Sequence, residues 1–169
     1  MHDSQLATPV GVIGVSWQGQ RLTRVLLRPE KTSSSAAPAW LIAELEAYFA
    51  DPGHRISCAI EPAGTAFQGR VWALIAAIPP GGRRTYGALA KELGSSARAV
   101  GNACRANPVP LRIPCHRVVS ATGLGGFAGD RDGRLLAIKR WLLDHEAGLR
   151  PAPLKNTGDA RLTASRPSP

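Results

Sequence analysis

The stretch from Asn107 to Val119 constrains the fold more than any other part of the chain, because Pro108, Pro110 and Pro114 all lie within it. Proline fixes the backbone φ angle, lacks an N–H group and disfavours the helical conformation in the residue before it. We therefore expect a rigid, extended loop at this point rather than a helix. The rest of the chain would fold around that loop.

Cys115 and His116 follow the third proline directly, and Arg117 comes next. Cysteine reacts as the thiolate, and a neighbouring imidazole or cation lowers the pKa of the thiol. His116 is placed to accept the thiol proton, and Arg117 adds positive potential. On adjacency alone, however, a buried cysteine beside a hydrogen-bonded structural histidine is the more frequent arrangement.

The net charge of +9 is unevenly distributed along the chain. Residues 1–63 carry 5 Lys/Arg against 6 Asp/Glu, whereas residues 64–150 carry 13 against 5. A basic excess confined to one part of a protein indicates a polyanionic partner, most simply nucleic acid. The alternative is charge that serves solubility and has no specific partner.

Three cysteines (Cys58, Cys104 and Cys115) are present, without the spacing of a zinc site, and the four histidines show no ligand spacing either. We expect no metal and no cofactor. A free nucleophilic thiol needs a reducing compartment, which favours the cytoplasm. No apolar run reaches membrane-spanning length and no signal peptide is recognisable, so we expect no membrane partner.

The first part of the chain has the pattern of a small α/β scaffold domain, residues 1–63. Residues 8–17 and 21–28 are predicted strands of a hairpin with its turn at 18–20, and residues 56–60 are a plausible third strand. Between them, residues 39–50 place apolar side chains at helical spacing.

The second part, residues 64–150, is predicted to be mainly helical. Thr65 and Thr85 are suitable N-caps for helices over 66–77 and 86–93, and a short Gly-Ser-Ser turn separates the latter from a helix over 97–106. Helix, short turn and helix form the helix-turn-helix pattern of DNA-binding proteins. A glycine-rich loop over 120–127 and a helix over 134–145 follow, and residues 151–169 are expected to be a disordered tail.

The helix over 97–106 is rich in small residues, and Arg98 and Arg105 lie about two turns apart on it, so both can project from one face. Small side chains let a helix approach another surface closely. That surface is either a neighbouring helix or a groove of DNA, with the arginines reaching phosphates or the base stack.

Several motifs together resemble the O6-alkylguanine-DNA alkyltransferases, also called methylated-DNA–protein-cysteine methyltransferases. The motifs keep the order and spacing of that family and cover about half of the chain: Phe67–Trp72, Thr85–Ala90, Ala97–Asn102, Asn107–Pro108, Pro114–Val118, Gly125–Phe127, Lys139–Leu143 and Glu146. The resemblance implies an α+β protein. Its small N-terminal α/β domain precedes a mainly helical helix-turn-helix domain that carries the cysteine loop.

The resemblance also implies an activity, namely direct repair of double-stranded DNA containing O6-alkylguanine. The alkyl group would pass to Cys115 in a single turnover, after the base is flipped out of the duplex, and the protein would act as a monomer. Whether O4-alkylthymine is also a substrate stays open.

The family's residue roles carry over by position. Cys115 is the nucleophile, His116 takes its proton through a water, and Glu146 supports the resulting imidazolium. Asn107 braces the loop, and Tyr86 donates a proton to the departing base. The expected DNA- or substrate-contacting residues are Arg98 (filling the gap left by the flipped base), Arg105, the Val118 carbonyl, Pro110, Phe127 and Arg117.

Two departures from the family pattern bear on the pocket: Ala128 stands where some relatives have serine, and residues 130–134 look like an insertion. Three other classes of protein fit this set of residues less well. The alkyltransferase-like proteins lack the cysteine, a helix-turn-helix regulator needs no Cys-His-Glu set, and papain-like hydrolases have Cys and His far apart in sequence.

Overall fold

The computed structural model describes residues 1–29, 35–129 and 133–155, which form an α+β fold. The strands are β1 (His2–Thr8), β2 (Gly11–Gln18), β3 (Arg21–Leu26), β4 (Ala59–Ile60), β5 (Arg84–Thr85) and β6 (Val118–Val119). The helices are α1 (Ala39–Ala50), α2 (Ala66–Ala76), α3 (Tyr86–Leu93), α4 (Ala97–Arg105), the short 3-10 helix η1 (Cys115–Arg117) and α5 (Arg134–Glu146). The expected fold class is confirmed.

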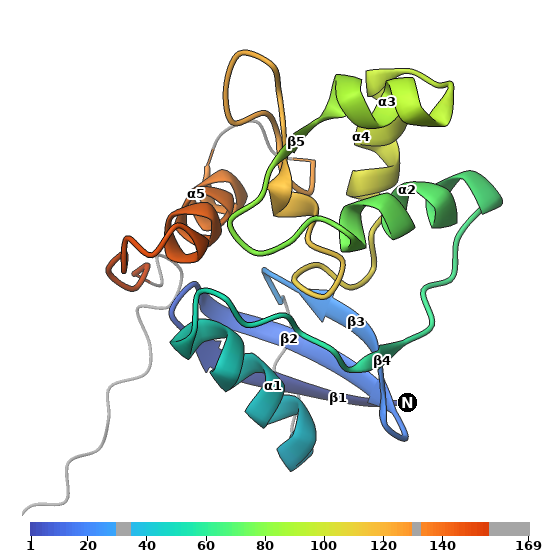
Figure 1. Cartoon of the computed structure of the whole chain (residues 1–169). Coiled ribbons are helices and arrows are strands. Elements are labelled where there is room, and N and C mark those ends of the chain that lie inside the picture. The colour runs from blue at the N-terminus through green and yellow to red at the C-terminus, as the bar shows by residue number, and fades with distance from the viewer. Residues whose placement is uncertain (30–34, 130–132, 156–169) are drawn as a thin grey trace, which may run out of the picture.

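The N-terminal half is a four-stranded sheet with α1 beside it (Figure 1). The strand order is β1-β2-β3-β4, antiparallel except for the parallel pair β3–β4. The predicted hairpin turn is present, and Gly19 takes a positive φ of 57° there, which glycine adopts without steric cost. Of the predicted strand over 56–60, only β4 pairs with the sheet.

β1 is a strand that the sequence pattern did not predict. It pairs along its whole length with β2, from His2 opposite Trp17 to Thr8 opposite Gly11. Most of its side chains are polar and at least partly exposed, because it is an edge strand, so it lacks the alternation of apolar residues that marks a half-buried strand. The predicted strand over 8–17 is therefore wrong at its start: β2 begins at Gly11.

The C-terminal half is mainly helical, and α2 and α3 begin at the predicted caps, Thr65 and Thr85, while Ser96 of the predicted turn caps α4. Thr65, Thr85 and Ser96 each accept a hydrogen bond from a backbone N–H in the first turn of α2, α3 and α4. Gly94 ends α3 in the left-handed conformation, with φ of 62°. α3 and α4 thus form the expected helix-turn-helix, and the bounds of the predicted helices agree with the structure to within one residue.

The proline-rich segment ends in a short helix instead of remaining extended throughout. Residues Cys115–Arg117 form η1, and Val118–Val119 then pairs in parallel with Arg84–Thr85. The expectation of an extended loop without helix is therefore wrong at the cysteine itself. Pro114 stands at the N-cap, where its missing N–H costs no hydrogen bond, so it starts the turn instead of preventing it.

The first five residues of the predicted disordered tail have defined contacts. Trp141 Nε1 donates to the Ala152 carbonyl at 2.8 Å, and Leu154 N–H donates to the Pro9 carbonyl at 2.7 Å. Disorder is therefore wrong for residues 151–155, because the extended chain offers its carbonyls to buried donors and the Leu154 side chain packs on the core. The rest of the tail, and residues 130–132 of the expected insertion, lie outside the described residues.

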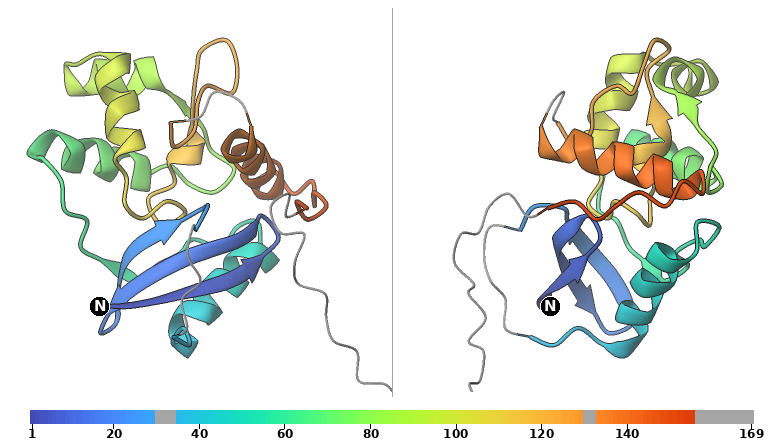
Figure 2. Two further views of the ribbon diagram at one scale, coloured as in Figure 1. Left: turned by 180° about the vertical axis from the view of Figure 1, so that it is seen from behind. Right: turned by 90° about the vertical axis from the view of Figure 1, so that its left-hand side faces the viewer.

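One cluster of buried side chains runs through both halves, and α5 lies where they meet (Figure 2). Val25 N–H of β3 donates to the Pro108 carbonyl at 2.9 Å, and Arg112 Nε donates to the Cys58 carbonyl at 2.9 Å. The sheet therefore holds the proline-rich loop directly. The boundary between residues 63 and 64 stays a prediction. Within the described residues, no helix has the length and apolar character needed to cross a membrane.

We expect Thr65→Ala to lower the free energy of unfolding by about 1 kcal/mol, because Thr65 and Gln68 form a reciprocal capping box at the start of α2. Urea denaturation followed by circular dichroism measures the change. Thr65→Ser, which keeps the hydroxyl, is the matched control and should lose much less. Equal losses for the two variants would contradict the assignment of the cap.

Candidate active site

Cys115 lies at the first position of η1, with 4% of its surface exposed. Its N–H donates to the Ile113 carbonyl at 2.8 Å, and the Arg117 N–H donates to the Pro114 carbonyl at 2.9 Å. Two consecutive tight turns therefore fix the backbone on either side of the thiol. A rigid backbone suits a nucleophile that must be held at attack distance.

Asn107 braces this loop with its side-chain amide. Nδ2 donates to the Ile113 carbonyl at 2.8 Å and to Sγ of Cys115 at 3.3 Å, while Oδ1 accepts the Val109 N–H at 3.0 Å. The amide thus joins the two ends of the proline-rich segment and also contacts the sulfur. The expected brace is present as hydrogen bonds, and its effect on reactivity stays a prediction.

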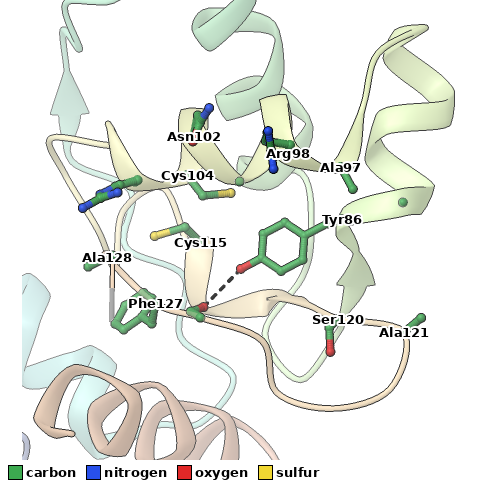
Figure 3. A pocket seen from close by; sticks show the side chains of 15 residues that line it. Tyr86, Ala97, Arg98, Asn102, Cys104, Cys115, Ser120, Ala121, Phe127 and Ala128 are labelled. Atoms are coloured by element: carbon green, nitrogen blue, oxygen red, sulfur yellow. Dashed lines mark hydrogen bonds between the residues drawn. The ribbon is translucent and has the colours of Figure 1, made fainter. Parts of the chain in front are cut away.

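Cys115 borders a pocket of about 570 Å³ that opens to solvent. The walls come from α3, from α4 and from the glycine-rich loop after β6 (Figure 3). Tyr86, Cys104 and Phe127 lie around the thiol, and Arg98 and Arg105 of α4 are also part of the lining. The volume is in the range typical of small-molecule sites. The helix-turn-helix and the thiol therefore share one cavity.

The carboxylate of Glu146, at the end of α5, is the centre of a buried polar cluster. Its Oε1 accepts hydrogen bonds from His116 Nε2 at 2.7 Å, Arg117 NH2 at 2.8 Å and the Tyr48 hydroxyl at 2.8 Å. Its Oε2 accepts Arg117 Nε at 2.9 Å and the Gly81 N–H at 3.3 Å. The side chains of His116 and Glu146 are fully buried. The expected His–Glu pair is therefore present.

The pKa values of both partners are shifted downward, for different reasons. Burial alone would raise the pKa of Glu146, but the hydrogen bonds from His116 and Arg117 and the positive charge of Arg117 outweigh it and hold that pKa well below its usual range. Burial lowers the pKa of His116, more than its bond to Glu146 raises it. The pair is therefore a carboxylate and a neutral imidazole at neutral pH.

The tautomer of His116 follows from this pairing. An ionised carboxylate only accepts, so Nε2 carries the hydrogen and Nδ1 keeps a lone pair. Nδ1 is buried and has no hydrogen-bond partner among the described residues. It is the nitrogen on which His116 can take up a proton.

The thiol of Cys115 is not acidified in the resting protein, contrary to the expectation from its neighbours. Burial raises the pKa of Cys115, and the Asn107 amide, the charge of Lys139 and the local N–H groups only partly offset that effect. The thiolate therefore has to form by proton transfer rather than by simple ionisation. His116, neutral and with a free nitrogen, has the matching acid–base state.

Arg117 does not face the pocket, so its expected contact with DNA or substrate is wrong. Only 2% of its surface is exposed. Its guanidinium donates to both oxygens of Glu146 and, at 2.6 Å, to the Ile78 carbonyl. A charge buried against a carboxylate must keep that partner, so Arg117 is part of the internal cluster.

Two residues of this site were not predicted from the sequence. Lys139 is fully buried, and its Nζ donates to the carbonyls of Val118 at 2.6 Å and Gly126 at 2.8 Å. Burial lowers its pKa to about 8, although interaction with the two pocket thiols opposes this. Tyr48 reaches Glu146 from α1. The motif 139–143 pointed to Lys139 without a role, and no sequence signal distinguished Tyr48 from an apolar helix position.

Of the other residues expected to contact the substrate, some line the pocket and some do not. Phe127 lines the pocket, and Tyr86 lines it while its hydroxyl donates to the Gly126 carbonyl at 3.1 Å. Pro110 is buried and is absent from the lining, so it does not wall the pocket as expected. The Val118 carbonyl already accepts a hydrogen bond from Lys139 Nζ. A hydrogen bond from a guanine amino group would therefore have to use the second lone pair of this oxygen.

Arg98 and Arg105 are exposed on α4 at the pocket mouth. The guanidinium group of Arg105 lies against the backbone of Gly129, where φ is 94°. A Cβ added to Gly129 would lie 2.9 Å from Nε of Arg105. Arg105 therefore joins α4 to the far rim of the pocket. Ala128, the departure from the family pattern, forms part of the same rim.

Together these features define a helix-turn-helix protein with a thiol-based active site. Residues 66–148 match the family described as 6-O-methylguanine DNA methyltransferase, DNA binding domain. A methylated-DNA–protein-cysteine methyltransferase of Mycobacterium bovis is 33% identical over 165 residues, 91% of this chain and 97% of that protein. The constitutive methylated-DNA–protein-cysteine methyltransferase of Bacillus subtilis is 33% identical over 82% of this chain and 91% of its own length.

Among solved structures, OGT of Mycobacterium tuberculosis in complex with DNA matches with a TM-score of 0.73 and 32% identity, covering 90% of this chain and 96% of that one. The chain therefore belongs to the methylated-DNA–protein-cysteine methyltransferase family, as its motifs predicted. The family is named for an enzyme reaction in which methylated DNA gives its alkyl group to a protein cysteine.

We expect Glu146→Gln to lower the free energy of unfolding at pH 7 by about 3 kcal/mol, because it leaves buried Arg117 without an opposite charge. The folded pKa of Glu146 is depressed, so its stabilisation is present above the ordinary value of 4.5 and is lost as pH falls toward the folded pKa. The stability gap between wild type and variant should therefore shrink from pH 7 to pH ~3. Urea denaturation at several pH values measures it, and a constant gap would contradict the assigned charge state.

Proposed function

We propose that this chain repairs O6-alkylguanine in double-stranded DNA by moving the alkyl group irreversibly onto Cys115. The observation that carries this proposal is that the Cys115 thiol and the small-residue face of α4 line one pocket. A DNA-facing helix and a nucleophile in the same cavity suit a reaction on a base that has entered that cavity. The names of the relatives support the same reaction.

The chemistry is a displacement at the alkyl carbon. The thiol gives its proton to Nδ1 of His116, through a bridging water, and Glu146 stabilises the imidazolium. The thiolate attacks the alkyl carbon, a sulfur–carbon bond forms, and the bond from carbon to O6 breaks. Guanine leaves with a proton, for which Tyr86 is the proposed donor. The reaction needs a nucleophile and an acid, and neither a metal nor a cofactor.

The product explains why each molecule would act once. A thioether has no easy route back to a thiol, and nothing in this reaction supplies one. We also propose that the base is flipped out of the duplex, since O6 cannot reach a buried sulfur while the base stays stacked. Arg98, exposed on α4 at the pocket mouth, would fill the space that the base leaves.

We also propose a second substrate, an oligomeric state and a cellular compartment. O4-alkylthymine offers the same kind of leaving group and is a second candidate substrate. The protein would act as a monomer, because one chain supplies the helix, the pocket and the relay. The cytoplasm is the proposed compartment, since Cys115 has to remain a reduced thiol.

Cys115→Ala should abolish alkyl transfer while DNA binding is largely retained, because the thiol is the acceptor but is buried beneath the pocket. Intact-mass spectrometry after incubation with O6-methylguanine duplex measures transfer as a one-time gain of a methylene, and peptide mapping localises it. Cys58→Ala is the matched control, since Cys58 lies outside this pocket. A labelled methyl group found on Cys58 or Cys104 of the wild type would overturn the assignment.

Arg98→Ala should slow repair of duplex DNA about tenfold or more, yet slow reaction with the free base O6-methylguanine much less, because only the duplex must be unstacked. Single-turnover rates on both substrates measure the difference. Placing the lesion opposite an abasic site should recover part of the loss. Arg105→Ala, by contrast, should mainly weaken binding and its salt dependence. Equal rate losses for Arg98→Ala on free base and duplex would exclude the wedge role.

A further inference from the structure

Tyr48 is a residue of the N-terminal half that reaches the buried acid of the active site. It lies in the last turns of α1 with 1% of its surface exposed, and its hydroxyl donates to Oε1 of Glu146 at 2.8 Å. Its backbone carbonyl is hydrogen-bonded to His145 Nε2, also at 2.8 Å. α1 is thus joined to the last turn of α5 by a side-chain and a main-chain contact.

The oxygen that Tyr48 contacts is the one that serves His116. Oε1 of Glu146 accepts from His116, Tyr48 and Arg117, whereas Oε2 accepts from Arg117 and the Gly81 N–H. The bidentate guanidinium and Gly81 already fix where the carboxylate lies. The phenol is therefore not needed to place Glu146, but it draws on the same negative charge that His116 would need when protonated.

The other ionisable groups facing this cluster come from elements of the C-terminal half. Arg117 lies on η1, and Cys115 precedes His116 on the same turn. Lys139 and His145 lie on α5, and the charge of Lys139 acts on His116 as well. Arg117 and Lys139 both disfavour a positive His116. The Tyr48 phenol stays protonated, because burial and the charge of Glu146 raise its pKa, so it acts only as a donor.

We propose that Tyr48 is a positioning residue of the alkyl-transfer reaction, which limits how strongly Glu146 holds protonated His116 by sharing the charge on Oε1. The inference rests on the proposed role of His116 as acceptor of the Cys115 proton. With the hydroxyl in place, the imidazole stays neutral and ready to take the proton. Without it, Glu146 binds the imidazolium more firmly, and His116 is already protonated at a higher pH.

The proton balance fixes the sign of the effect. The reactive state holds one proton shared between the Cys115 thiol and His116, and a second proton on His116 blocks acceptance. The fall of the transfer rate at low pH therefore reports protonation of His116 while the Cys115 thiol still holds its proton. Tyr48→Phe should move that midpoint up by about half a unit to one unit, because one hydrogen bond to the opposing charge is lost. A stronger phenol donor should move it down.

The test compares three proteins by two readouts. The pH dependence of single-turnover transfer from O6-methylguanine duplex gives the midpoint, and 15N NMR of labelled histidine, assigned with His116→Gln, gives the titration of His116 without any substrate. Tyr48→Phe is the first variant. The matched control is Phe49→Leu, which loosens the same junction at the rings of Tyr48 and Trp141 but removes no hydrogen bond to Glu146. Its midpoint should not move.

Fluorination supplies an arm that does not depend on removing the hydroxyl. The chain has two tyrosines, so in a Tyr86→Phe background Tyr48 is the only one. Incorporating 3-fluorotyrosine makes the phenol more acidic and a stronger donor with little change in volume. Because Tyr86 is the proposed proton donor to guanine, this arm is measured by the NMR titration of His116 alone, against unfluorinated protein in the same Tyr86→Phe background. The His116 midpoint should fall on fluorination, opposite to its shift in Tyr48→Phe, and this comparison stands even if the phenylalanine variant fails to fold.

Opposite shifts for phenylalanine and fluorotyrosine support the inference. A midpoint that is unchanged in both, or a uniform loss of rate at every pH, would show that Tyr48 has only a structural role. A downward shift for Tyr48→Phe would show that it places Glu146 instead of sharing its charge. If wild-type protein gains no methylene, the proposed function fails, while the NMR titration still decides the role of Tyr48.

Discussion

The buried carboxylate of Glu146 is the interaction on which the rest of the site depends. It accepts hydrogen bonds from α1 (Tyr48), from the turn after α2 (Gly81) and from η1 (His116 and Arg117), and it belongs to α5 itself. A carboxylate removed from water costs several kcal/mol unless its partners replace the lost hydration. Each of these elements must therefore be in place before the charge is tolerated, which couples assembly of the two halves to assembly of the active site.

This arrangement separates two electrostatic tasks that a reactive cysteine needs. The surroundings of Cys115 keep the thiol protonated at rest, since burial dominates there. The surroundings of His116 keep the imidazole neutral, although a carboxylate touches it. A neutral pair avoids the cost of two buried charges until a substrate arrives. In the proposed reaction the thiolate would form near Lys139, whose ammonium group donates to two carbonyls.

Local sequence signals predicted the parts of the fold that local physics determines. Thr65, Thr85, Ser96 and Gly94 cap or end helices through their own side chains or backbone, so these helices could be read from the chain. β1 could not, because an exposed edge strand has no apolar alternation. The contacts of Tyr48 and Arg117 span 98 and 29 residues along the chain, and no short pattern encodes them.

Arg117 also shows why counting charges misjudges a binding surface. The basic excess of residues 64–150 pointed correctly to a DNA-binding family, but Arg117 and Lys139 contribute to that count and are buried. Arg84 pairs with Glu92, and Arg112 binds a carbonyl of the sheet half. The charge left for phosphate contacts is therefore smaller than the sequence suggests. Arg117 and Lys139 stabilise the interior, and the proposed phosphate contacts fall to exposed basic residues such as Arg98 and Arg105 on the small-residue face of α4.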